Sequence, residues 1–264
     1  MNSPTPRPLT LITGASGGIG ADLARVFARH GHDLALVARD GARLEGMADE
    51  IAGTGRPRPL VMALDLTAPG AAAQLAAALA RKNAQVACLV NNAGFGLLGD
   101  FAGAELAGQL GMVDLNIRAL VELTSLFLPP IRAAKGRILN VASIAAFLPG
   151  PGFAVYYATK AFVVSFSAAL GQELKGEGVT VSALCPGPTA SGFQARAGFS
   201  ARLPLAKIAM MDTMSVAEAG YAGLMRGKRL IVPGLSNKIT VAVSALTPHS
   251  LSLPIIAKLQ KSRS

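Results

Sequence analysis

The sequence predicts an α/β fold with a doubly wound parallel sheet and helices on both of its faces. Short apolar, β-favouring runs recur between residues 9 and 184, and stretches with helical periodicity separate them. The first of these runs leads directly into a glycine cluster that opens a helix. Strands that alternate with helices throughout a chain require right-handed crossovers and therefore a parallel sheet.

The composition suits a single domain that covers residues 1–264. The chain is rich in Ala and Gly, with few aromatic residues and no Trp. Cys88 and Cys185 lie in apolar surroundings without metal-ligand spacing, so we expect buried thiols in a reducing compartment and no metal. No apolar run reaches the ~18 to 20 residues that span a bilayer, and the N-terminus lacks a signal peptide's hydrophobic region. We therefore expect a soluble, cytoplasmic protein.

Positive charge concentrates after residue 190. The net charge is +10, and the ten Lys and Arg residues of this last segment face only Asp212 and Glu218, so the segment carries +8. Such a basic segment attracts nucleic acid, an anionic membrane or a phosphorylated ligand, or it simply keeps a surface solvated. The charge alone does not choose between these interpretations.

The glycine cluster after the first strand, 9–13, has the form of a phosphate-binding turn. Gly14, Gly18 and Gly20 follow the spacing Gly-x-x-x-Gly-x-Gly, and a helix then runs to about Gly31. Strand, glycine turn and helix together aim backbone N–H groups and a helix N-terminus at a phosphate. Because this unit comes first in the chain, we predict that it binds a dinucleotide.

The end of the second strand, 33–38, indicates which dinucleotide is bound. NAD-binding folds place an acidic residue there for the ribose 2′-hydroxyl, whereas an Arg accommodates a 2′-phosphate. This chain has Arg39, whose planar fork of donors suits a phosphate, followed by Asp40. Asp40 is either the ribose ligand shifted by two positions or, as we favour, the N-cap of a helix over 41–52. We predict NADP(H) rather than NAD(H).

Two further strands end in polar residues at the same edge of the sheet. The third strand, 59–64, is followed by Asp65, which either accepts a bond from an adenine amino group or caps a helix over 70–82. The fourth strand, 86–90, is followed by Asn-Asn-Ala-Gly at 91–94, a turn that allows a ligand to approach closely.

A long helical pattern over 102–128 contains Asn116 in its middle. An Asn there competes for backbone hydrogen bonds and weakens the helix. It is either an ordinary packed or exposed polar residue, or it is kept to kink the helix and hold a water. We expect Pro129 and Pro130 to end this helix and restart the chain.

Candidate catalytic groups follow the fifth strand, 137–142. Ser143 lies at its tip, and thirteen positions later Tyr156 and Lys160 lie one turn apart on a helix over 152–175. A tyrosine normally titrates near pH ~10, and a neighbouring cation lowers that pKa. We therefore predict that Tyr156 is a proton donor and acceptor beside Lys160, with Ser143 holding the reacting oxygen. The sixth strand, 179–184, ends in Pro-Gly at 186–187.

Together these motifs resemble the short-chain dehydrogenase/reductase family in its single-domain form. The resemblance covers residues 9–232 and rests on the order and spacing of 13–20, 91–94, Asn116, Ser143, 156–160 and 186–187. It implies a Rossmann-type sheet with seven strands, the last at 229–232, and a cofactor-binding and catalytic core over 9–185. It also implies an NADP(H)-dependent carbonyl reductase or alcohol dehydrogenase.

The resemblance implies a set of residues that bind the dinucleotide along the carboxyl edge of the sheet. They are Gly14, Ser16, Gly17, Gly18, Ile19 and Gly20 for the pyrophosphate and adenosine side, Arg39 with Ser16 for the 2′-phosphate, Asp65 and Leu66 for adenine, Asn92, Ala93 and Gly94 for the ribose and nicotinamide, and Pro186, Gly187 and Thr189 for the nicotinamide amide. The segment Pro-Thr-Ala-Ser at 188–191 departs from the family, which more often has Val or Ile followed one residue later by Thr.

The resemblance also implies catalytic roles for four residues. Lys160 bonds the nicotinamide ribose and lowers the pKa of Tyr156, which exchanges a proton with the substrate oxygen. Ser143 orients that oxygen, and Asn116 holds a water that relays protons from Lys160 to solvent. The neighbouring Tyr157 lies a helical step of about 100° away, and we expect it to serve packing.

The substrate side is expected to be apolar. A lid over 186–214 contains Phe193, Phe199, Leu203, Leu205, Ile208, Met210 and Met211, and it would face Phe95, Leu97, Phe153 and residues 144–148. Such a lid either binds a lipophilic ketone or alcohol or packs on its own domain. A carboxylate contact by Arg196 or Arg202 is less favoured.

About thirty residues, 233–264, extend beyond the minimal fold, and we expect them to form a helical extension. They are apolar and basic, so they either contact a partner subunit or the lid, which we favour, or rest on a membrane surface.

Family members commonly pair through the helices near 102–128 and 152–175, which implies a homodimer or homotetramer. We expect a small-molecule substrate and no nucleic-acid partner. The alternative function is a non-enzymatic NADP(H)-binding sensor or scaffold that uses the basic tail, although a sensor has no need for Ser143, Tyr156 and Lys160 together.

Overall fold

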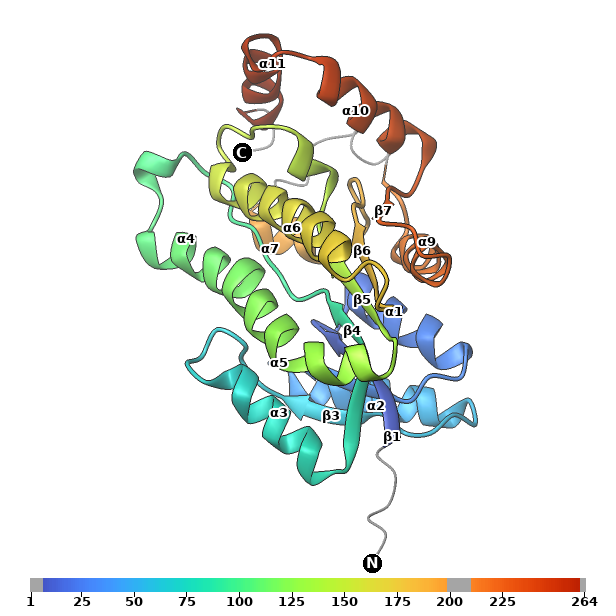
Figure 1. Cartoon of the computed structure of the whole chain (residues 1–264). Coiled ribbons are helices and arrows are strands. Elements are labelled where there is room, and N and C mark those ends of the chain that lie inside the picture. The colour runs from blue at the N-terminus through green and yellow to red at the C-terminus, as the bar shows by residue number, and fades with distance from the viewer. Residues whose placement is uncertain (1–6, 199–209, 262–264) are drawn as a thin grey trace, which may run out of the picture.

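The computed structural model describes residues 7–198 and 210–261, and the predicted parallel sheet lies at its centre (Figure 1). Seven strands pair in the order β3-β2-β1-β4-β5-β6-β7, all parallel. This order confirms the doubly wound Rossmann-type prediction. The strands are β1 (Arg7–Thr13), β2 (Leu34–Ala38), β3 (Leu60–Ala63), β4 (Ala84–Asn91), β5 (Arg137–Val141), β6 (Thr180–Leu184) and β7 (Leu230–Ile231).

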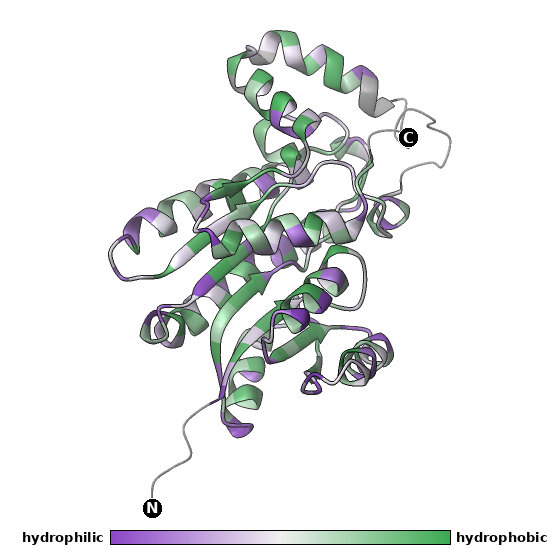
Figure 2. Ribbon diagram, turned by 90° about the vertical axis from the view of Figure 1, so that its right-hand side faces the viewer, coloured by the Kyte–Doolittle hydropathy of each residue, from purple (hydrophilic) through white to green (hydrophobic). Residues whose placement is uncertain are grey.

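Helices cover both faces of the sheet, because its strands are apolar on both sides. In β1, Leu11 packs into one core and Ile12 into the other, and both side chains are fully buried. One face holds α1 (Gly18–Arg29), α2 (Gly41–Gly53) and α9 (Thr213–Met225). The other face holds α3 (Ala71–Arg81), α5 (Ala119–Ala133) and α6 (Ala154–Glu173). Figure 2 shows the apolar strands enclosed between these two layers.

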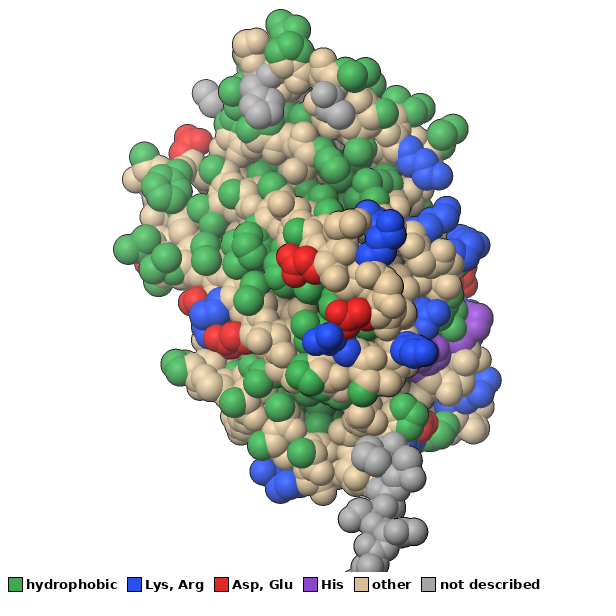
Figure 3. Space-filling model, in the orientation of Figure 1, with side chains coloured by type: hydrophobic (Ala, Val, Ile, Leu, Met, Phe, Trp, Pro, Cys, Tyr) green, Lys and Arg blue, Asp and Glu red, His purple; other side chains and the backbone are tan. Residues whose placement is uncertain are grey.

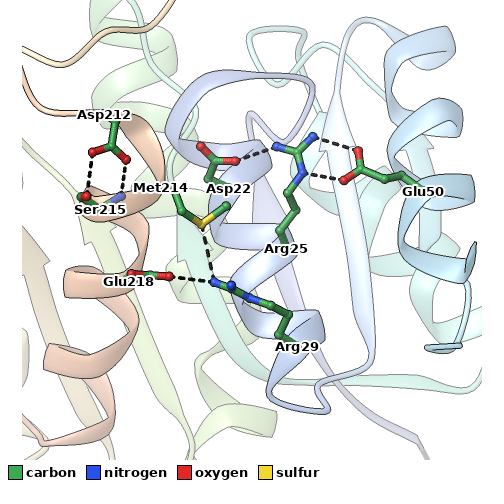
Figure 4. A network of polar contacts seen from close by, with 8 residues as sticks. All are labelled: Asp22, Arg25, Arg29, Glu50, Asp212, Met214, Ser215 and Glu218. Carbon is green, nitrogen blue, oxygen red and sulfur yellow. Dashed lines mark hydrogen bonds and ion pairs between the residues drawn. The ribbon is translucent and has the colours of Figure 1, made fainter. Parts of the chain in front are cut away.

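Ion pairs tie α1 to its two neighbours on the same face (Figure 4). Arg25 in α1 makes a two-pronged contact with Glu50 of α2, at 2.7 and 2.8 Å, and a third bond to Asp22 at 2.6 Å. Arg29 at the end of α1 bonds Glu218 of α9 at 3.0 Å. These pairs are partly exposed, so they orient the helices more than they stabilise the fold.

The predicted long helix over 102–128 has a break at Asn116. A short 3₁₀ turn, η1 (Phe101–Gly103), precedes α4 (Leu106–Val113), and the π-helical segment η2 (Asp114–Arg118) then joins α4 to α5. A π segment widens the helix by one residue, and such segments are frequent at functional sites. The structure therefore favours the interpretation in which Asn116 is kept for a distortion of the helix.

The expectation that Pro129 and Pro130 end this helix is wrong. Both prolines lie inside α5, which continues to Ala133. A proline removes the hydrogen bond to the carbonyl four residues earlier. Here those carbonyls belong to Ser125 and Leu126, which are exposed, so water can replace the lost bonds.

The C-terminal part of the chain is helical, as predicted. The short helix α7 (Phe193–Ala197) lies in the expected lid, and α10 (Leu235–Leu246) and α11 (His249–Lys261) form the extension beyond β7. Residues 199–209 of the lid, with Phe199, Leu203, Leu205 and Ile208, lie outside the described residues, as do 262–264 of the tail. Cys88 and Cys185 are free and buried, as expected, and burial raises the pKa of each thiol to about 12.

Within the described residues, α6 is the one helix long and apolar enough to cross a membrane by length and composition. It packs along β6 and the 3₁₀ turn η3 (Ile144–Phe147), and it buries Lys160 against the sheet. A buried lysine and a face packed on strands are properties of a core helix. We therefore assign α6 to the core of the fold.

A chain of buried polar side chains runs beneath the carboxyl end of the sheet. The Asn91 amide in β4 donates to Asn140 Oδ1 in β5 at 2.9 Å and to Thr124 Oγ1 in α5 at 3.1 Å. Asn140 in turn donates to Ser167 Oγ in α6 at 2.9 Å. Breaking one of these buried hydrogen bonds would leave a polar group unpaired, so the bonds fix both helices relative to the two strands.

We predict that Asn140→Ala lowers the free energy of unfolding by about 2 to 3 kcal/mol. The substitution removes an acceptor from Asn91 and a donor from Ser167, and both of these side chains are buried. Urea denaturation measures the effect. The control is Thr240→Ala, which removes an exposed hydroxyl bonded to Ser236 O and should change stability by less than about 0.5 kcal/mol. Equal changes in the two variants would contradict the structural role of the buried chain.

Candidate active site

The predicted site residues converge at the carboxyl edge of the sheet, around the point where the strand order reverses. That point lies between β1 and β4, which are neighbours in the sheet although far apart in sequence. The glycine turn follows β1, and 91–94 follows β4. Ser143 comes just after β5, and Pro186 just after β6. In open α/β sheets a ligand binds in the crevice at this switch point.

The glycine turn leaves no room for a side chain at Gly14 or Gly20. Gly14 and Gly18 have φ values of +66° and +56°, which favour glycine. A Cβ on Gly14 would lie 2.8 Å from Asn92 Nδ2, and one on Gly20 would collide with the Gly14 carbonyl. The N-cap of α1 is Gly17, which offers no side-chain acceptor to the first N–H groups of the helix. This turn therefore fits a phosphate, which would accept from those donors.

Thr13 and Asn92 hold the turn in place. The Thr13 hydroxyl accepts from the backbone N–H groups of Asn92 and Ala93, both at 3.0 Å. The Asn92 amide donates to the carbonyls of Thr13 at 2.9 Å and Gly14 at 3.2 Å. The Asn92 amide thus uses its donors on the Thr13 and Gly14 carbonyls. A contact between Asn92 and a ribose would have to come from the main-chain atoms of Asn92. The role of the Thr13 hydroxyl had no signature in the local sequence.

After β2, Asp40 caps the next helix, as predicted, and Arg39 is left exposed. Asp40 is the N-cap of α2, where its Oδ1 accepts from Arg43 N at 3.0 Å, and its Oδ2 pairs with Arg43 Nε at 3.2 Å. Arg39 is exposed and makes no ion pair within the described residues. Its guanidinium is therefore the free cation at the tip of β2, beside the glycine turn.

Asp65 does not cap a helix, contrary to one of its two predicted roles. The helix α3 starts at Ala71 behind Gly70, while Asp65 Oδ1 accepts from Thr67 N at 2.9 Å and Thr67 Oγ1 at 2.7 Å. These two hydrogen bonds, with a contribution from the charge of Arg39, lower the pKa of Asp65. The charge of Arg39, at the tip of β2, thus makes a minor contribution at Asp65, after β3. Leu66 is buried in the core.

The catalytic candidates lie together behind β5. Tyr156 and Lys160 are both buried on α6, and Lys160 Nζ donates to Val141 O, at the end of β5, at 2.9 Å. Nζ lies 5.8 Å from the centre of the Tyr156 ring. Burial lowers the pKa of Lys160 to about 8, because an ammonium loses its hydration there.

The predicted lowering of the Tyr156 pKa by Lys160 is wrong for this structure. Burial raises the pKa of Tyr156, and the hydrogen bond with Ser143 is the influence that opposes it. The physical reason is that desolvation disfavours the phenolate, while the Lys160 ammonium is directed at a backbone carbonyl. Tyr156 is therefore held as a protonated phenol next to the Ser143 hydroxyl.

Asn116 links the turn after β4 to α6. Its Oδ1 accepts from Phe95 N at 3.1 Å, and its Nδ2 donates to Phe95 O at 2.9 Å and Thr159 Oγ1 at 3.0 Å. A Cβ on Gly94 would lie 2.9 Å from Asn116 Oδ1 and 3.4 Å from Lys160 Nζ. Asn116 and Lys160 thus approach each other across Gly94, which must be glycine. The predicted water relay through Asn116 stays a prediction.

Ser143 and the loop after β6 share hydrogen bonds. Ser143 Oγ accepts from Ala145 N at 3.1 Å and donates to Pro186 O at 3.5 Å. Thr189 donates to Gly187 O at 2.9 Å, so its hydroxyl is turned back onto its own loop. A Cβ on Gly187 would collide with the amide of Asn237 in α10, which sequence reasoning did not associate with the site.

Aromatic rings form the wall in front of Tyr156. The Phe153 ring stacks on the Tyr156 ring with centroids 4.5 Å apart, and Phe193 of α7 lies 5.3 Å away on a tilted plane. The backbone of α7 is tied to the body by a bond from Leu98 N to Ala197 O at 2.9 Å. The described part of the lid thus packs on its own domain and also lines the site.

Comparison with known proteins agrees with this arrangement. A family model described as short chain dehydrogenase matches residues 8–201, which include every predicted catalytic and cofactor-binding residue. Oxidoreductase UcpA from Escherichia coli (strain K12) is 36% identical over 179 residues, which cover 67% of this chain and 67% of that protein.

Two solved structures are similar over nearly the whole chain. A short-chain dehydrogenase from Sphingobium yanoikuyae in complex with NADPH is 35% identical, with a TM-score of 0.80 over 90% of this chain and 94% of that one. The bulky-bulky ketone specific alcohol dehydrogenase from Comamonas testosteroni is 32% identical, with a TM-score of 0.76 over 92% and 94%. Fold, site geometry and matched sequence agree, and the chain belongs to the short-chain dehydrogenase/reductase family.

Proposed function

We propose that the protein is an NADP(H)-dependent oxidoreductase that reduces a lipophilic ketone, or oxidises the matching secondary alcohol, with Tyr156 as general acid and base. The observation that carries this proposal is the buried Tyr156 phenol, hydrogen-bonded to Ser143 and one helical turn from Lys160. Family membership makes the chain an oxidoreductase of C=O and CH–OH groups. The cofactor preference, the substrate type and the role of Tyr156 go beyond family membership and are part of the proposal.

The residues divide the work at the reacting oxygen. Ser143 holds the carbonyl oxygen of the substrate by a hydrogen bond, and Tyr156 gives it a proton in the reducing direction. Because burial raises the pKa of Tyr156, the phenol stays protonated at neutral pH, which is the form that reduction needs. A dinucleotide, when bound, supplies the hydride. In the oxidising direction Tyr156 takes the proton from the alcohol instead.

Lys160 and Asn116 restore the proton of Tyr156. The Lys160 ammonium uses one donor on Val141 O, which leaves two for the nicotinamide ribose and for a relay. A pKa of about 8 lets Lys160 lose and regain a proton near neutral pH. Asn116 lies across Gly94 from this nitrogen, in the widened turn of η2, so we propose that the relay to solvent passes there.

Two features support NADP(H) as the cofactor. Arg39 is exposed and without an ion pair in the described part of the chain, and Asp40 is occupied as the cap of α2. A ribose 2′-phosphate would therefore meet a cation instead of a carboxylate. The similar enzyme from Sphingobium yanoikuyae was solved with NADPH.

The wall around Tyr156 supports a lipophilic substrate. Phe95, Leu97, Phe153 and Phe193 belong to one apolar cluster with the Tyr156 ring. Such a wall favours bulky apolar groups on the ketone. The similar alcohol dehydrogenase from Comamonas testosteroni is specific for bulky-bulky ketones.

We also propose a cytoplasmic homodimer or homotetramer. Large apolar side chains on α4, α5 and α6 are exposed: Leu106, Leu110, Val113, Leu126 and Phe162. A second copy packed on these helices would cover them. The two buried free thiols fit a reducing compartment.

The first prediction about the function tests the chemistry. We expect Tyr156→Phe to lower kcat for NADPH-dependent reduction of bulky hydrophobic ketones by about 10³-fold, because the variant has no proton to give. Binding of NADPH, measured by fluorescence, should change little. Tyr157→Phe is the matched control on the same helix and should keep kcat within a few-fold. Unchanged turnover by Tyr156→Phe, or no reduction of any ketone in the panel by the intact protein, would overturn the proposed function.

The second prediction tests the cofactor. We expect Arg39→Ala to weaken NADPH binding by about 10- to 100-fold, the usual worth of one charge-assisted bond to a phosphate, with little effect on NADH. Arg43→Ala removes another exposed arginine, one that pairs with Asp40 instead. The control should leave the ratio of the two affinities nearly unchanged. An equal loss for NADPH and NADH in Arg39→Ala would exclude the 2′-phosphate contact.

The third prediction tests the phosphate turn. In Gly20→Ala the new methyl collides with the Gly14 carbonyl, so we expect binding of either dinucleotide to fall by more than about 100-fold. Gly46→Ala is the control, because a Cβ in that position of α2 meets nothing within 4 Å. It should bind normally and raise the free energy of unfolding by about 0.5 to 1 kcal/mol. Normal dinucleotide binding by Gly20→Ala would show that the turn is not where the phosphates lie.

A further inference from the structure

The helix α10 turns its apolar side toward solvent. Leu235, Ile239, Val243 and Leu246 have exposed fractions of 74%, 55%, 56% and 86%. At 100° per residue these four side chains lie within about 80° of one another around the helix. Surface helices of globular proteins normally direct such a stripe at the core. The stripe of α10 therefore has no apolar partner within the described residues.

Contacts with the loop after β6 and with η3 fix α10 in this orientation. On its inner side Asn237 is buried against Gly187, and its amide donates to Pro233 O at 2.8 Å. The helix also packs on η3, the 3₁₀ turn that follows Ser143. The buried, hydrogen-bonded Asn237 therefore sets the direction of α10, and the apolar stripe faces outward as a result.

The helix α11 continues the apolar surface. Leu251 and Ile255 are exposed by 62% and 61%, and Lys258 is exposed on the same side of the helix. Ser252 and Ile256 face inward instead and are buried. Figures 1 and 2 place both α10 and α11 at the end of the molecule opposite the N-terminus, and Figure 3 shows hydrophobic side chains gathered over this end.

The charge of this region selects the kind of partner. The sequence contains no Asp or Glu after Glu218, and the extension from residue 233 onward contains four basic residues: Lys238, Lys258, Lys261 and Arg263. Within α10, Lys238 borders the apolar stripe. A second copy of this chain would place like charges against each other across the stripe. A partner surface with an apolar interior and an anionic boundary matches both the apolar stripe and the basic residues beside it.

We propose that α10 and α11 rest on an anionic lipid bilayer, with the apolar stripe in the boundary between headgroups and acyl chains and with Lys238 and Lys258 over the headgroups. Each helix is about 20 Å long, which is too short to span a hydrocarbon core of about 30 Å, so the contact is peripheral. The sequence favoured a subunit or lid contact for this segment; the outward stripe and the missing acidic residues favour the membrane.

The test measures how the full-length protein sediments with lipid vesicles. We expect at least about ten-fold stronger binding to vesicles with one third phosphatidylglycerol than to pure phosphatidylcholine, and weaker binding in high salt, because the lysines contribute through charge. Intact protein that stays in solution with both kinds of vesicle would overturn the proposal.

Charge variants show whether the contact uses this face. Lys238→Glu with Lys258→Glu should weaken binding to the anionic vesicles by at least about 25-fold, since each basic residue near such a surface is worth about 1 kcal/mol, or five-fold. Lys82→Glu with Lys175→Glu changes the net charge equally at exposed positions elsewhere and should have a much smaller effect. Equal losses in the two double variants would mean general charge attraction and would refute the assigned face.

A triple variant, Ile239→Ser with Val243→Ser and Leu246→Ser, removes the stripe. We expect it to lose more than about ten-fold in vesicle binding while its mass in sedimentation equilibrium stays that of the intact protein. Phe101→Ser, which alters an exposed ring in η1, is the control. A smaller assembly with vesicle binding intact would show that α10 contacts a second copy and would overturn the proposal. If the triple variant fails to bind dinucleotide or to fold, the charge variants decide.

Discussion

The site depends on the pairing of β1 with β4, which brings two distant turns into contact at the switch point of the sheet. The Asn92 amide reaches the carbonyls of Thr13 and Gly14, and the Thr13 hydroxyl reaches back to the backbone of Asn92. Each group in this exchange satisfies another, so the turn is rigid before any ligand arrives. The glycines follow from this closeness, because a side chain on Gly14 or Gly20 would enter the same space.

The same burial acts in opposite directions on the two catalytic candidates. It raises the pKa of the Tyr156 phenol and lowers that of the Lys160 amine, so both groups are driven toward their neutral forms. Lys160 was expected to lower the pKa of Tyr156, but that expectation left out the cost of desolvating the phenolate and the ammonium. The contact with Ser143 is the influence that opposes the rise in the pKa of Tyr156.

Local rules in the sequence predicted much of this molecule, and contacts between distant segments account for what they missed. The capping role of Asp40 and the helical spacing of Tyr156 and Lys160 depend on neighbours a few residues away, so they could be predicted. The contact between Gly187 and Asn237 joins segments fifty residues apart and has no local signature. The two prolines in α5 were misjudged because the rule that a proline ends a helix omits where the freed carbonyls point. The roles of the site residues in binding and catalysis stay predictions.

The outward stripe of α10 lowers the stability of the fold, because its apolar side chains stay in contact with water. Apolar surface left in water forgoes about 25 cal/mol for each Å² that could have been buried. The helix nevertheless keeps this orientation, because Asn237 is buried and bonded on the opposite side, and turning the helix would expose that bond. A lipid surface removes the cost without any change in the protein. It would also bring η3 and Ser143 close to the phase in which a lipophilic ketone dissolves, so one orientation of one helix would serve both membrane contact and supply of the substrate.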